Sequence, residues 1–350
     1  MATAALTPPA HAPASRVERS TPASRLGMVL GLVLLLGLAA LPFWGDRATM
    51  RLAIEIFSYV ALAQMWNLLA GYAGLVSVGQ QAFVGLGGYA LFALAIFAGV
   101  DPLLGLALAG PIAALSAVPT ALMVFRLRGA YFAIGTWVVA EVYRLVFAQV
   151  SALGGGSGTS LPAAIVRGIA ESRELRENLI YWTALAIVVA VLAFVYLLLR
   201  SRWGLALTAI RDSETAAESV GVDKRRTKLL IYVLAAGVTG VVGALIFLQK
   251  LRISPDAAFS ANDWTAFVIF IVVIGGIGRI EGPIVGTLVF FASRELFADL
   301  GSWYLMMLGG LAVLVMLVAP KGLWGYLADR YDLQLFPLQR RLRLLDPKEP

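Results

Sequence analysis

Residues 56–100 contain no charged side chain, and this single run limits the possible folds more than any other feature of the sequence. A membrane-spanning helix needs about 20 mostly apolar residues, so the run is long enough for two crossings. Further runs with few or no charges lie at 26–45, 102–125, 129–149, 178–199, 229–249, 264–278, 282–298 and 300–320. We therefore predict an all-α polytopic membrane protein with about ten transmembrane helices.

The composition agrees with this class and excludes several chemistries. Apolar residues make up 60% of the chain and charged residues 14%, and the mean hydropathy is +0.83. Soluble domains are typically about 45–50% apolar and about 25% charged. The chain has no cysteine, and its only histidine is His11, so thiolate or histidine metal sites are not available in the membrane body. We predict no cofactor, no metal site, no catalytic residue and no nucleic-acid partner.

Basic residues orient the predicted helices. Cytoplasmic loops carry an excess of lysine and arginine, and seven such residues fall within residues 200–228. We therefore expect both termini and this loop on the cytoplasmic side. The predicted organisation is a disordered cytoplasmic tail (1–25), a transmembrane domain (26–326) with a cytoplasmic loop (201–228) and a periplasmic loop (150–178), and a cytoplasmic C-terminal tail (327–350).

The first apolar run has two interpretations. Arginines precede residues 26–45, as basic residues precede the apolar region of a signal peptide. The run is long for such a region, however, and it is long enough to cross a bilayer. We expect a first helix that is retained rather than cleaved.

Glycine interrupts the long uncharged run in its second half. Residues 56–70 contain no glycine, whereas residues 71–88 contain six. Glycine lets a backbone leave the helix, and the freed backbone groups must then be packed in protein or line a water-filled cavity. Since Ser77, Gln80 and Gln81 add polar groups, we predict a translocation pathway lined by Asn67, Gly71, Tyr72, Gly74, Ser77, Gly79, Gln80, Phe83, Gly87 and Tyr89. The alternative is close helix packing by small residues.

A second interruption lies in the other half of the chain. Here Gly275, Gly276, Gly278, Gly282 and Pro283 break an apolar run. Paired segments interrupted by glycine or proline in two halves of a chain are typical of the central site of a transporter. We therefore add these five residues to the predicted pathway, again with close packing as the alternative.

Few charges are embedded in the predicted spans. Glu141 and Arg144 are three residues apart, so they share a helix face, and we expect a structural ion pair near the outer end. Glu55, Asp263, Arg294, Glu295 and Asp299 fall near predicted span ends, where anchoring at the interface accounts for them.

The loop at 201–228 predicts a short helix. Asp212 or Ser213 can cap it, and Gly221 can end it after Ala217–Val220. Such a helix could lie on the lipid surface or dock into a groove on a partner. Ala216-Ala217, followed by three residues and Gly221, resembles the loop of bacterial ABC importer permeases, in which Glu-Ala-Ala is followed by three residues and Gly. Thr215 stands in place of that Glu.

Five blocks in order make the chain similar to the LivM-like permeases of branched-chain amino-acid ABC importers. Two positions depart from the family pattern: Arg279 stands where a small Ser or Thr is frequent, and Gln81 stands where small residues or His are common. The five blocks are Asn67–Tyr89, Arg126–Ile134, Ala209–Gly221, Gly275–Gly286 and Pro320–Gly325.

The resemblance implies a permease fold, import of branched-chain or related amino acids, and a multi-pass location in the bacterial inner membrane. It also implies a second homologous permease, two cytosolic ATPase subunits and a periplasmic binding protein. The chain has no G-x-x-x-x-G-K-[ST] motif, so an ATPase would be a separate polypeptide. The residues that would couple to it are Arg211, Asp212, Glu214, Ala216, Ala217 and Gly221.

Several alternatives stay open. Importers of the same class carry urea, short amides or other small carboxylates. A secondary carrier that works alone would need acidic residues at the midplane, which the spans largely lack. An intramembrane enzyme would need a nucleophile and base or a metal set, for which the sequence offers few residues.

Overall fold

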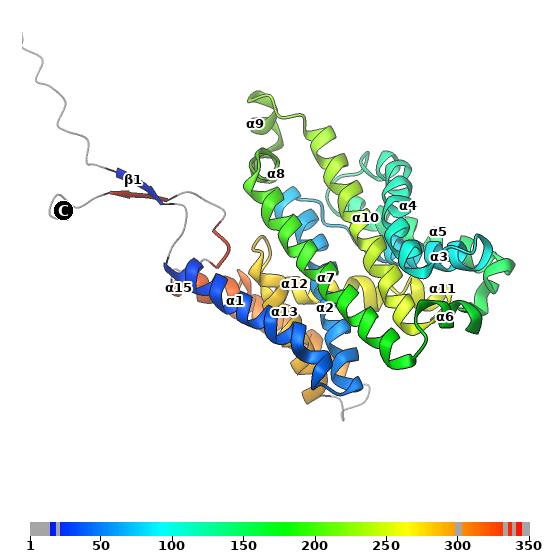
Figure 1. The fold of residues 1–350 in the computed structure, drawn as a ribbon. Helices are drawn as coiled ribbons and strands as arrows, with labels where there is room; N and C mark the ends of the chain where they lie inside the picture. The colour runs from blue at the N-terminus through cyan, green and yellow to red at the C-terminus, as the bar shows by residue number, and fades with distance from the viewer. Residues whose placement is uncertain (1–14, 19–21, 298–302, 332–334, 338–340, 345–350) are drawn as a thin grey trace, which may run out of the picture.

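Two helices, α2 (Arg47–Asn67) and α10 (Lys224–Lys250), lie at the centre of a helical bundle in the computed structural model of this chain (Figure 1). α10 packs along α3 (Gln80–Phe97) and α4 (Pro102–Val124). α2 packs against α7 (Arg173–Arg200), α12 (Phe267–Gly275) and α13 (Glu281–Leu296). The structure describes residues 15–18, 22–297, 303–331, 335–337 and 341–344.

The other helices surround this centre or lie at its ends. They are α1 (Pro22–Ala40), α5 (Ala130–Ala148), α6 (Ala163–Ile169), α8 (Arg202–Asp212), α9 (Glu214–Ser219), α11 (Pro255–Ala258), α14 (Trp303–Val318) and α15 (Gly322–Tyr331). Short 3-10 segments are η1 (Leu41–Phe43), η3 (Ser151–Leu153) and η4 (Gly155–Ser157), and π-helical segments are η2 (Leu68–Tyr72) and η5 (Asn262–Ala266). Strand β2 (Thr159–Ser160) pairs antiparallel with β3 (Arg252–Ile253).

The predicted class is confirmed. Within the described residues, eight helices are long and apolar enough to cross a membrane. The stretch Gly27–Phe43 is shorter but apolar, and α13 spans 16 residues, about 24 Å at 1.5 Å per residue. These two account for the difference from the prediction of about ten, because they fall below the length of a full crossing.

Polar caps begin several of the spanning helices. The N–H of Thr49 donates to Asp46 at 3.3 Å, that of Leu103 to Asp101 at 2.8 Å, and that of Leu175 to Ser172 at 3.0 Å. Each cap satisfies one of the backbone donors that a helix start leaves without an intrahelical partner.

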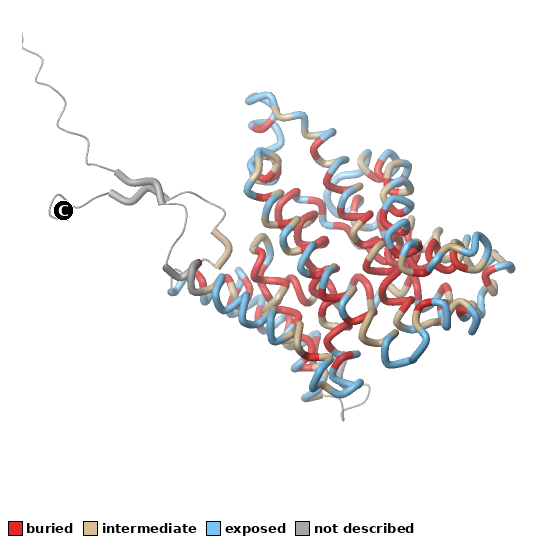
Figure 2. The backbone as a smooth tube through the Cα atoms, viewed as in Figure 1, coloured by how far each residue is buried: buried red, intermediate tan, exposed pale blue. Residues whose placement is uncertain are grey.

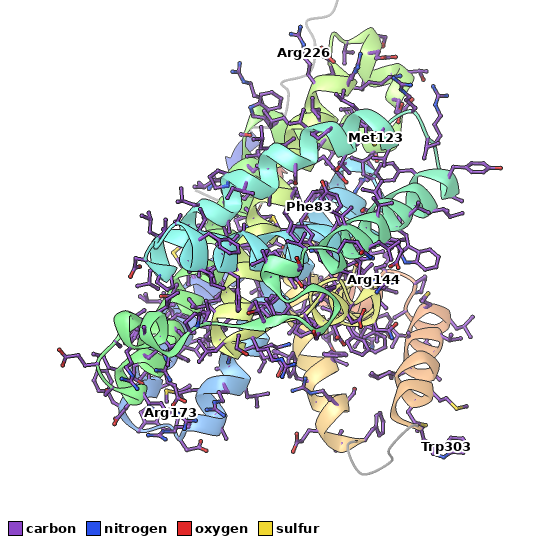
Figure 3. The ribbon with its side chains drawn as sticks, turned by 90° about the vertical axis from the view of Figure 1, so that its right-hand side faces the viewer. Phe83, Met123, Arg144, Arg173, Arg226 and Trp303 are labelled. Atoms are coloured by element: carbon purple, nitrogen blue, oxygen red, sulfur yellow. The ribbon has the colours of Figure 1, made fainter. Side chains whose placement is uncertain are left out.

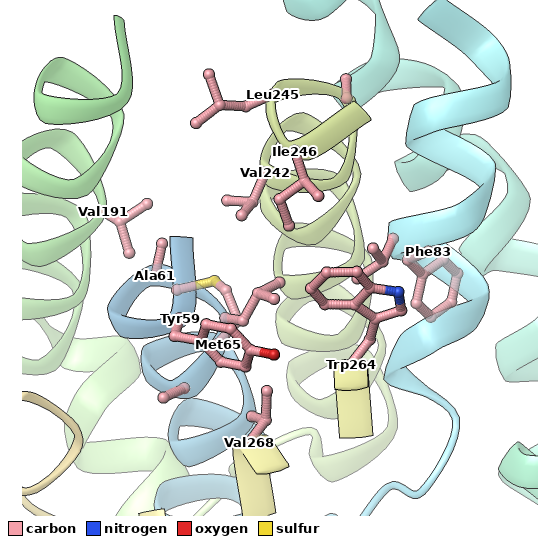
Figure 4. Close-up of a cluster of buried hydrophobic side chains, with 14 of the residues drawn as sticks. Tyr59, Ala61, Met65, Phe83, Val191, Val242, Leu245, Ile246, Trp264 and Val268 are labelled. Atoms are coloured by element: carbon pink, nitrogen blue, oxygen red, sulfur yellow. The ribbon is translucent and has the colours of Figure 1, made fainter. Parts of the chain in front are cut away.

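The core joins α2, α7, α10 and the segment that leads into α12. Figure 4 shows Tyr59 and Met65 of α2 beside Val242 and Ile246 of α10, with Trp264 of η5 close to them. Tyr59 packs against Trp264 with 6.0 Å between ring centroids. Burial is greatest along this centre, as Figure 2 shows.

The outer helices expose apolar side chains. α5 is the least buried of the eight candidate spans. On α5, Tyr131 and Trp137 are exposed, and on α1, Leu30 and Leu34 are exposed. Large exposed apolar patches are rare on soluble monomers and are expected where a surface meets lipid or another subunit.

Four of the charges in or near the predicted spans form ion pairs, whereas Asp263 and Glu295 form none with the described residues. Glu141 and Arg144 pair at 2.5 Å, as expected from their spacing, and Arg144 also contacts Asp256 at 2.7 Å. Arg294 forms a bidentate contact with Glu55, at 2.6 and 2.9 Å. Asp299 lies outside the described residues.

Both termini differ from featureless tails where the structure describes them. α1 begins at Pro22, inside the predicted tail, because proline suits the first turn of a helix. β1 (Ser15–Glu18) pairs antiparallel with β4 (Arg341–Leu344), away from the bundle (Figure 1). Most of the predicted 1–25 tail lies outside the described residues.

Candidate functional site

The first glycine-rich interruption begins where α2 ends. After Asn67 the chain widens into the π-helix η2, continues without regular structure through residues 74–79, and re-enters a helix at Gln80. π-helical turns in α-helices are frequent at functional sites.

Neighbouring side chains satisfy the backbone groups that this interruption frees. The indole of Trp66 donates to the carbonyl of Ser77 at 2.8 Å, and the N–H of Val78 donates to the hydroxyl of Thr136 at 3.0 Å. The amide of Gln80 donates to the carbonyl of Leu62 at 2.9 Å. Most of this segment is packed in protein, whereas Gly74 and Val76 are exposed and line a cavity.

The second interruption is a tight turn between α12 and α13. Gly276 has φ +127° and Gly278 φ +77°, conformations that L side chains rarely adopt. The two helices approach so closely that a Cβ at Gly275 would lie 1.8 Å from the carbonyl oxygen of Gly282. The glycines therefore permit both the turn and the close crossing.

The two interruptions, far apart in sequence, contact each other. The Asn67 side chain accepts from the N–H of Gly278 at 2.8 Å and donates to the carbonyl of Arg279 at 2.9 Å. Gln64, one turn earlier on α2, donates to the carbonyl of Ile280 at 2.6 Å. A Cβ at Gly71 would lie 2.6 Å from the Gly278 nitrogen, so the backbones touch. We call this contact the α2–α12 joint.

The start of α15 completes the joint. A Cβ at Gly322 would lie 2.3 Å from the Cα of Gly276, so this glycine too permits backbone contact. Asp329 on α15 receives hydrogen bonds from Arg279 at 2.5 Å and Lys321 at 2.7 Å. Arg279, the departure from the family pattern, thus has a local carboxylate partner.

Arg211 connects the predicted coupling segment to the same place. Its guanidinium donates to the carbonyl of Gly71 at 3.0 Å and also contacts Asp212 at 3.0 Å. Arg211 is in the last turn of α8, which with α9 stands at one end of the bundle (Figure 1). Figure 3 shows the same axis, with Arg226 at this α8–α9 end and Arg173 and Trp303 at the opposite end.

α9 is the short helix that the loop predicted. Ser213 caps it by accepting from the N–H of Ala216 at 3.3 Å, and Gly221 follows with φ +86°. Glu214 pairs with Lys228 at 2.5 Å and with Lys224 at 3.4 Å, which fastens α9 to the start of α10. These contacts hold the pKa of Glu214 below its usual value, chiefly through the hydrogen bond from Lys228.

One face of α9 is turned outward. Ala217 is 1% exposed, whereas Ala216 is exposed and Val220 is 76% exposed. Val220 is the C-cap residue directly after α9, four positions from Ala216, and the two present a small apolar surface at this end of the helix. Ala216 is among the predicted coupling residues and Val220 is not, although the four-residue spacing indicates Val220 as well.

Other predicted pathway residues lie deeper in the bundle and are closely packed. Ser77, Gln80 and Phe83 surround a very small pocket beside Tyr232. Tyr89 stacks between Phe147 and Phe259, at 4.5 and 5.9 Å between ring centroids.

Glycines at the same depth serve as contact points between helices. A Cβ at Gly87 would lie 1.9 Å from the carbonyl oxygen of Gly240, and one at Gly79 would lie 2.2 Å from that of Thr136. Close packing, the alternative given for these glycines, describes them in this structure. A role in translocation stays a prediction.

A cavity of about 1080 Å³ opens near the α8–α9 end. Gly74 and Glu214 line it, together with Arg126, Arg128 and Lys224. Pro283 and Tyr72 belong to the α2–α12 joint region instead, and both are buried. The predicted residues therefore fall into three places: the joint, the packed interior and the wall of this cavity.

Three polar residues outside the predicted site hold the two interruptions. Gln64 and Thr136 bind backbone groups of the two breaks, and Thr265 is hydrogen bonded to Gln81. Gln64 precedes Asn67 by three residues, so the helical period could have indicated it; Thr136 and Thr265 come from distant spans and carry no such signal.

Comparison with known proteins gives a family match. The family described as "Branched-chain amino acid transport system / permease component" matches residues 48–319. The described α1 lies before this match, whereas the joint and α8–α9 lie within it. No solved structure matches the chain.

Individual relatives agree with the family match. The high-affinity branched-chain amino acid transport system permease protein LivM of Escherichia coli K12 is 31% identical over 88% of this chain and 76% of its own. The probable branched-chain amino acid transport permease protein LivM of Methanocaldococcus jannaschii is 24% identical over 69% of this chain and 74% of its own. A LivH protein of Escherichia coli K12 is 32% identical over 39% of this chain and 44% of its own.

Proposed function

Because the chain belongs to the family of permease components of branched-chain amino acid transport systems, we propose that it carries branched-chain amino acids inward across the bacterial inner membrane as one subunit of an ABC importer. Its partners are a second, LivH-like permease, two cytosolic ATPase subunits and a periplasmic binding protein that delivers the substrate. The names of its relatives supply the substrate class, and the similarity to both LivM and LivH proteins supports a paired permease.

The α8–α9 end faces the cytoplasm in this proposal, with both termini on the same side. The basic residues of α8 and of the start of α10 support this orientation. An ATPase subunit docks on the outward face of α9, where Ala216 and Val220 are exposed. An apolar helix face fitted into a groove is a recurring mode of partner recognition.

The hydrogen bond from Arg211 to the Gly71 carbonyl is the observation that carries the mechanism. It ties the docking segment to the end of α2, and Asn67 ties that end to the turn between α12 and α13. Movement of the ATPases displaces α8, and the α2–α12 joint passes the displacement to α2 and α12. Rocking of these spans exposes the path alternately to the two sides.

Reconstitution in proteoliposomes tests the proposal. The reconstituted system contains the chain, a LivH-like permease, both ATPases and the binding protein. It should accumulate radiolabelled leucine when ATP is present on the side of the membrane where the ATPases bind. Omission of any one component should abolish uptake. Leucine uptake by this chain alone, driven by an ion gradient, would overturn the proposal.

A further inference from the structure

Positive charge gathers around a cavity at the end of the bundle opposite α8 and α9. This cavity, of about 740 Å³, lies among the N-terminal ends of α2 and α7, the C-terminal ends of α10 and α13, and η5. Six basic side chains and two acidic ones line it: Arg47, Arg51, Arg173, Arg176, Lys250 and Arg294, with Glu55 and Glu177.

A second, shallower cavity of about 500 Å³ adjoins the first. Four basic residues line it, and no acidic residue does: Arg167, Arg176, Lys250 and Arg252. Arg176 and Lys250 belong to both cavities, so the two together carry eight basic and two acidic side chains. We call the two cavities the basic basin.

The two carboxylates neutralise only part of this charge. Glu177 contacts Arg51 at 2.9 Å, Arg173 at 3.1 Å and Arg47 at 3.5 Å, and Glu55 contacts Arg294. In the described part of the chain, no carboxylate lies within 4.0 Å of Arg167, Arg176, Lys250 or Arg252.

The uncompensated charges stand in positions that favour an anion. Arg176 is half-buried, so part of its hydration is lost without a protein counter-charge. Lys250 is exposed, and its ammonium lies 5.0 Å from the centroid of the Trp264 ring, a cation–π contact that holds it at the cavity without supplying a counter-charge. Basic residues are depleted on the outer side of membrane proteins, so in the orientation proposed above this concentration is unexpected without a ligand.

Below the charged rim the basin is apolar. The inner part of the larger cavity is lined by Met50, Ile54, Tyr59, Ile180, Ile246 and Trp264. A ligand that suits both parts carries an oxyanion on an apolar body, since guanidinium and ammonium groups bind carboxylate and phosphate strongly.

We propose that the basic basin is a binding site for a carboxylate or phosphate carried on an apolar body, held by Arg176 and Lys250. Two sources share this chemistry: the headgroup of an anionic phospholipid and the carboxylate of an aliphatic amino acid. Only the second source depends on the proposed transport function.

Binding to the purified, detergent-solubilised chain tests the site without the ATPases. One arm measures retention of phosphatidylglycerol against phosphatidylcholine of the same acyl chains by native mass spectrometry. The other arm measures equilibrium binding of radiolabelled leucine, with leucinol, which lacks the carboxylate, as a competitor. The double variant Arg176→Gln, Lys250→Gln should weaken binding of the preferred anion by about tenfold or more.

Two control double variants distinguish the loss of charge at the site from a general loss of structure. Arg176→Lys with Lys250→Arg keeps the charges and should retain most of the affinity. Arg128→Gln with Arg225→Gln removes two charges from the cavity at the α8–α9 end and should leave binding unchanged. Size-exclusion chromatography reports folding, and if the double variant aggregates, the single Arg176→Gln variant takes its place.

Each outcome decides something about the site. Preference for phosphatidylglycerol alone identifies a lipid site, and leucine binding that leucinol does not displace identifies a carboxylate site. The proposal is overturned if phosphatidylglycerol binds no better than phosphatidylcholine and leucinol displaces leucine as well as leucine itself does, or if the charge-removing variant keeps its affinity. Because no ATPase is present, a failure of ATP-driven uptake would leave this result standing.

Discussion

The side chain of Asn67 holds Gly278 across the bundle, with 2.8 Å between the Asn67 Oδ1 and the Gly278 backbone nitrogen. The other end of the same amide donates to the carbonyl of Arg279. Asn67 is fully buried, so neither hydrogen bond can be replaced by one to bulk water. One asparagine therefore joins two spans that are separated by most of the chain.

Asn67→Ala should destabilise the protein. The substitution leaves the Gly278 N–H and the Arg279 carbonyl without partners, at about 1–3 kcal/mol for each buried group. We expect the thermal unfolding midpoint in detergent to fall by several degrees. It can be followed by intrinsic tryptophan fluorescence, because the chain has no cysteine for a thiol-reactive dye. Asn178→Ala is the matched control, because its side-chain oxygen has no hydrogen-bond partner among the described residues. An equal fall in both variants would contradict the role of the joint.

Arg211→Gln should separate ATP hydrolysis from uptake in the reconstituted importer. The neutral side chain weakens the link to the Gly71 carbonyl, so hydrolysis continues while leucine accumulation per ATP falls several-fold. Arg202→Gln is the control, since Arg202 is exposed at the start of the same helix. An unchanged ratio of uptake to hydrolysis in Arg211→Gln would remove Arg211 from the mechanism.

Two neighbouring alanines of α9 should respond differently to tryptophan. Ala216→Trp adds bulk to the exposed face, so the purified chain should keep its thermal stability while the ATPase subunits bind more weakly. Ala217→Trp places a large ring in a site that is 1% exposed and should lower stability by about 1–3 kcal/mol or more. The measurements are co-purification with the ATPases and the unfolding midpoint. Normal ATPase binding by Ala216→Trp would show that the docking face lies elsewhere.

Gly87→Ala should damage packing between α3 and α10. The added methyl would lie 1.9 Å from the Gly240 carbonyl oxygen, so the helices must separate, at a cost of about 1–3 kcal/mol or more. Gly309→Ala on α14 meets nothing within 4 Å and should be neutral or slightly stabilising, because alanine favours helix. Both are compared by thermal unfolding in the same detergent. Equal stability of the two variants would contradict the close crossing.

Acid should loosen α9 before the rest of the bundle. The pKa of Glu214 is lowered in the folded protein, chiefly by the hydrogen bond from Lys228, so its contribution to stability is present above its ordinary pKa of 4.5. That contribution is lost as the pH falls below 4.5 and through the lowered folded-state pKa. Because the pair is partly exposed, the effect is below about 1 kcal/mol.

Hydrogen exchange of α9 amides at pH 5 and at pH 3 measures this loosening after correction for the intrinsic rate. Glu214→Gln should show little difference between the two conditions, because it cannot titrate. A pH dependence of the same size in both proteins would assign the effect to another group.

The class of fold, the interruptions and the capped helix of the loop were predictable from the sequence because each rests on local chemistry. Uncharged length indicates crossings, glycine clusters indicate breaks, and Ser213 with Gly221 marks the ends of α9. The resemblance to a permease family rests on short sequence blocks that occur in the same order as in the family.

What the sequence could not supply is which distant segments meet. Nothing in the local pattern at Asn67 indicates that its partner is Gly278, and nothing at Gly87 indicates Gly240. Such pairings depend on how the spans pack, and one helix offers several faces for contact. The basic basin has the same origin, because its basic residues come from the ends of α2, α7, α10 and α13 and from α6 and β3, which no sequence motif relates.

The hydrogen bond between Arg211 and Gly71 also restricts what the α8–α9 segment can do by itself. A surface helix connected to the bundle only by loops could shift without moving the spans. Here the guanidinium clamps the last turn of α8 to the π-helical end of α2. In the importer proposed above, a displacement of α8 would therefore pass to α2 and to the turn between α12 and α13 through two short, directional hydrogen bonds.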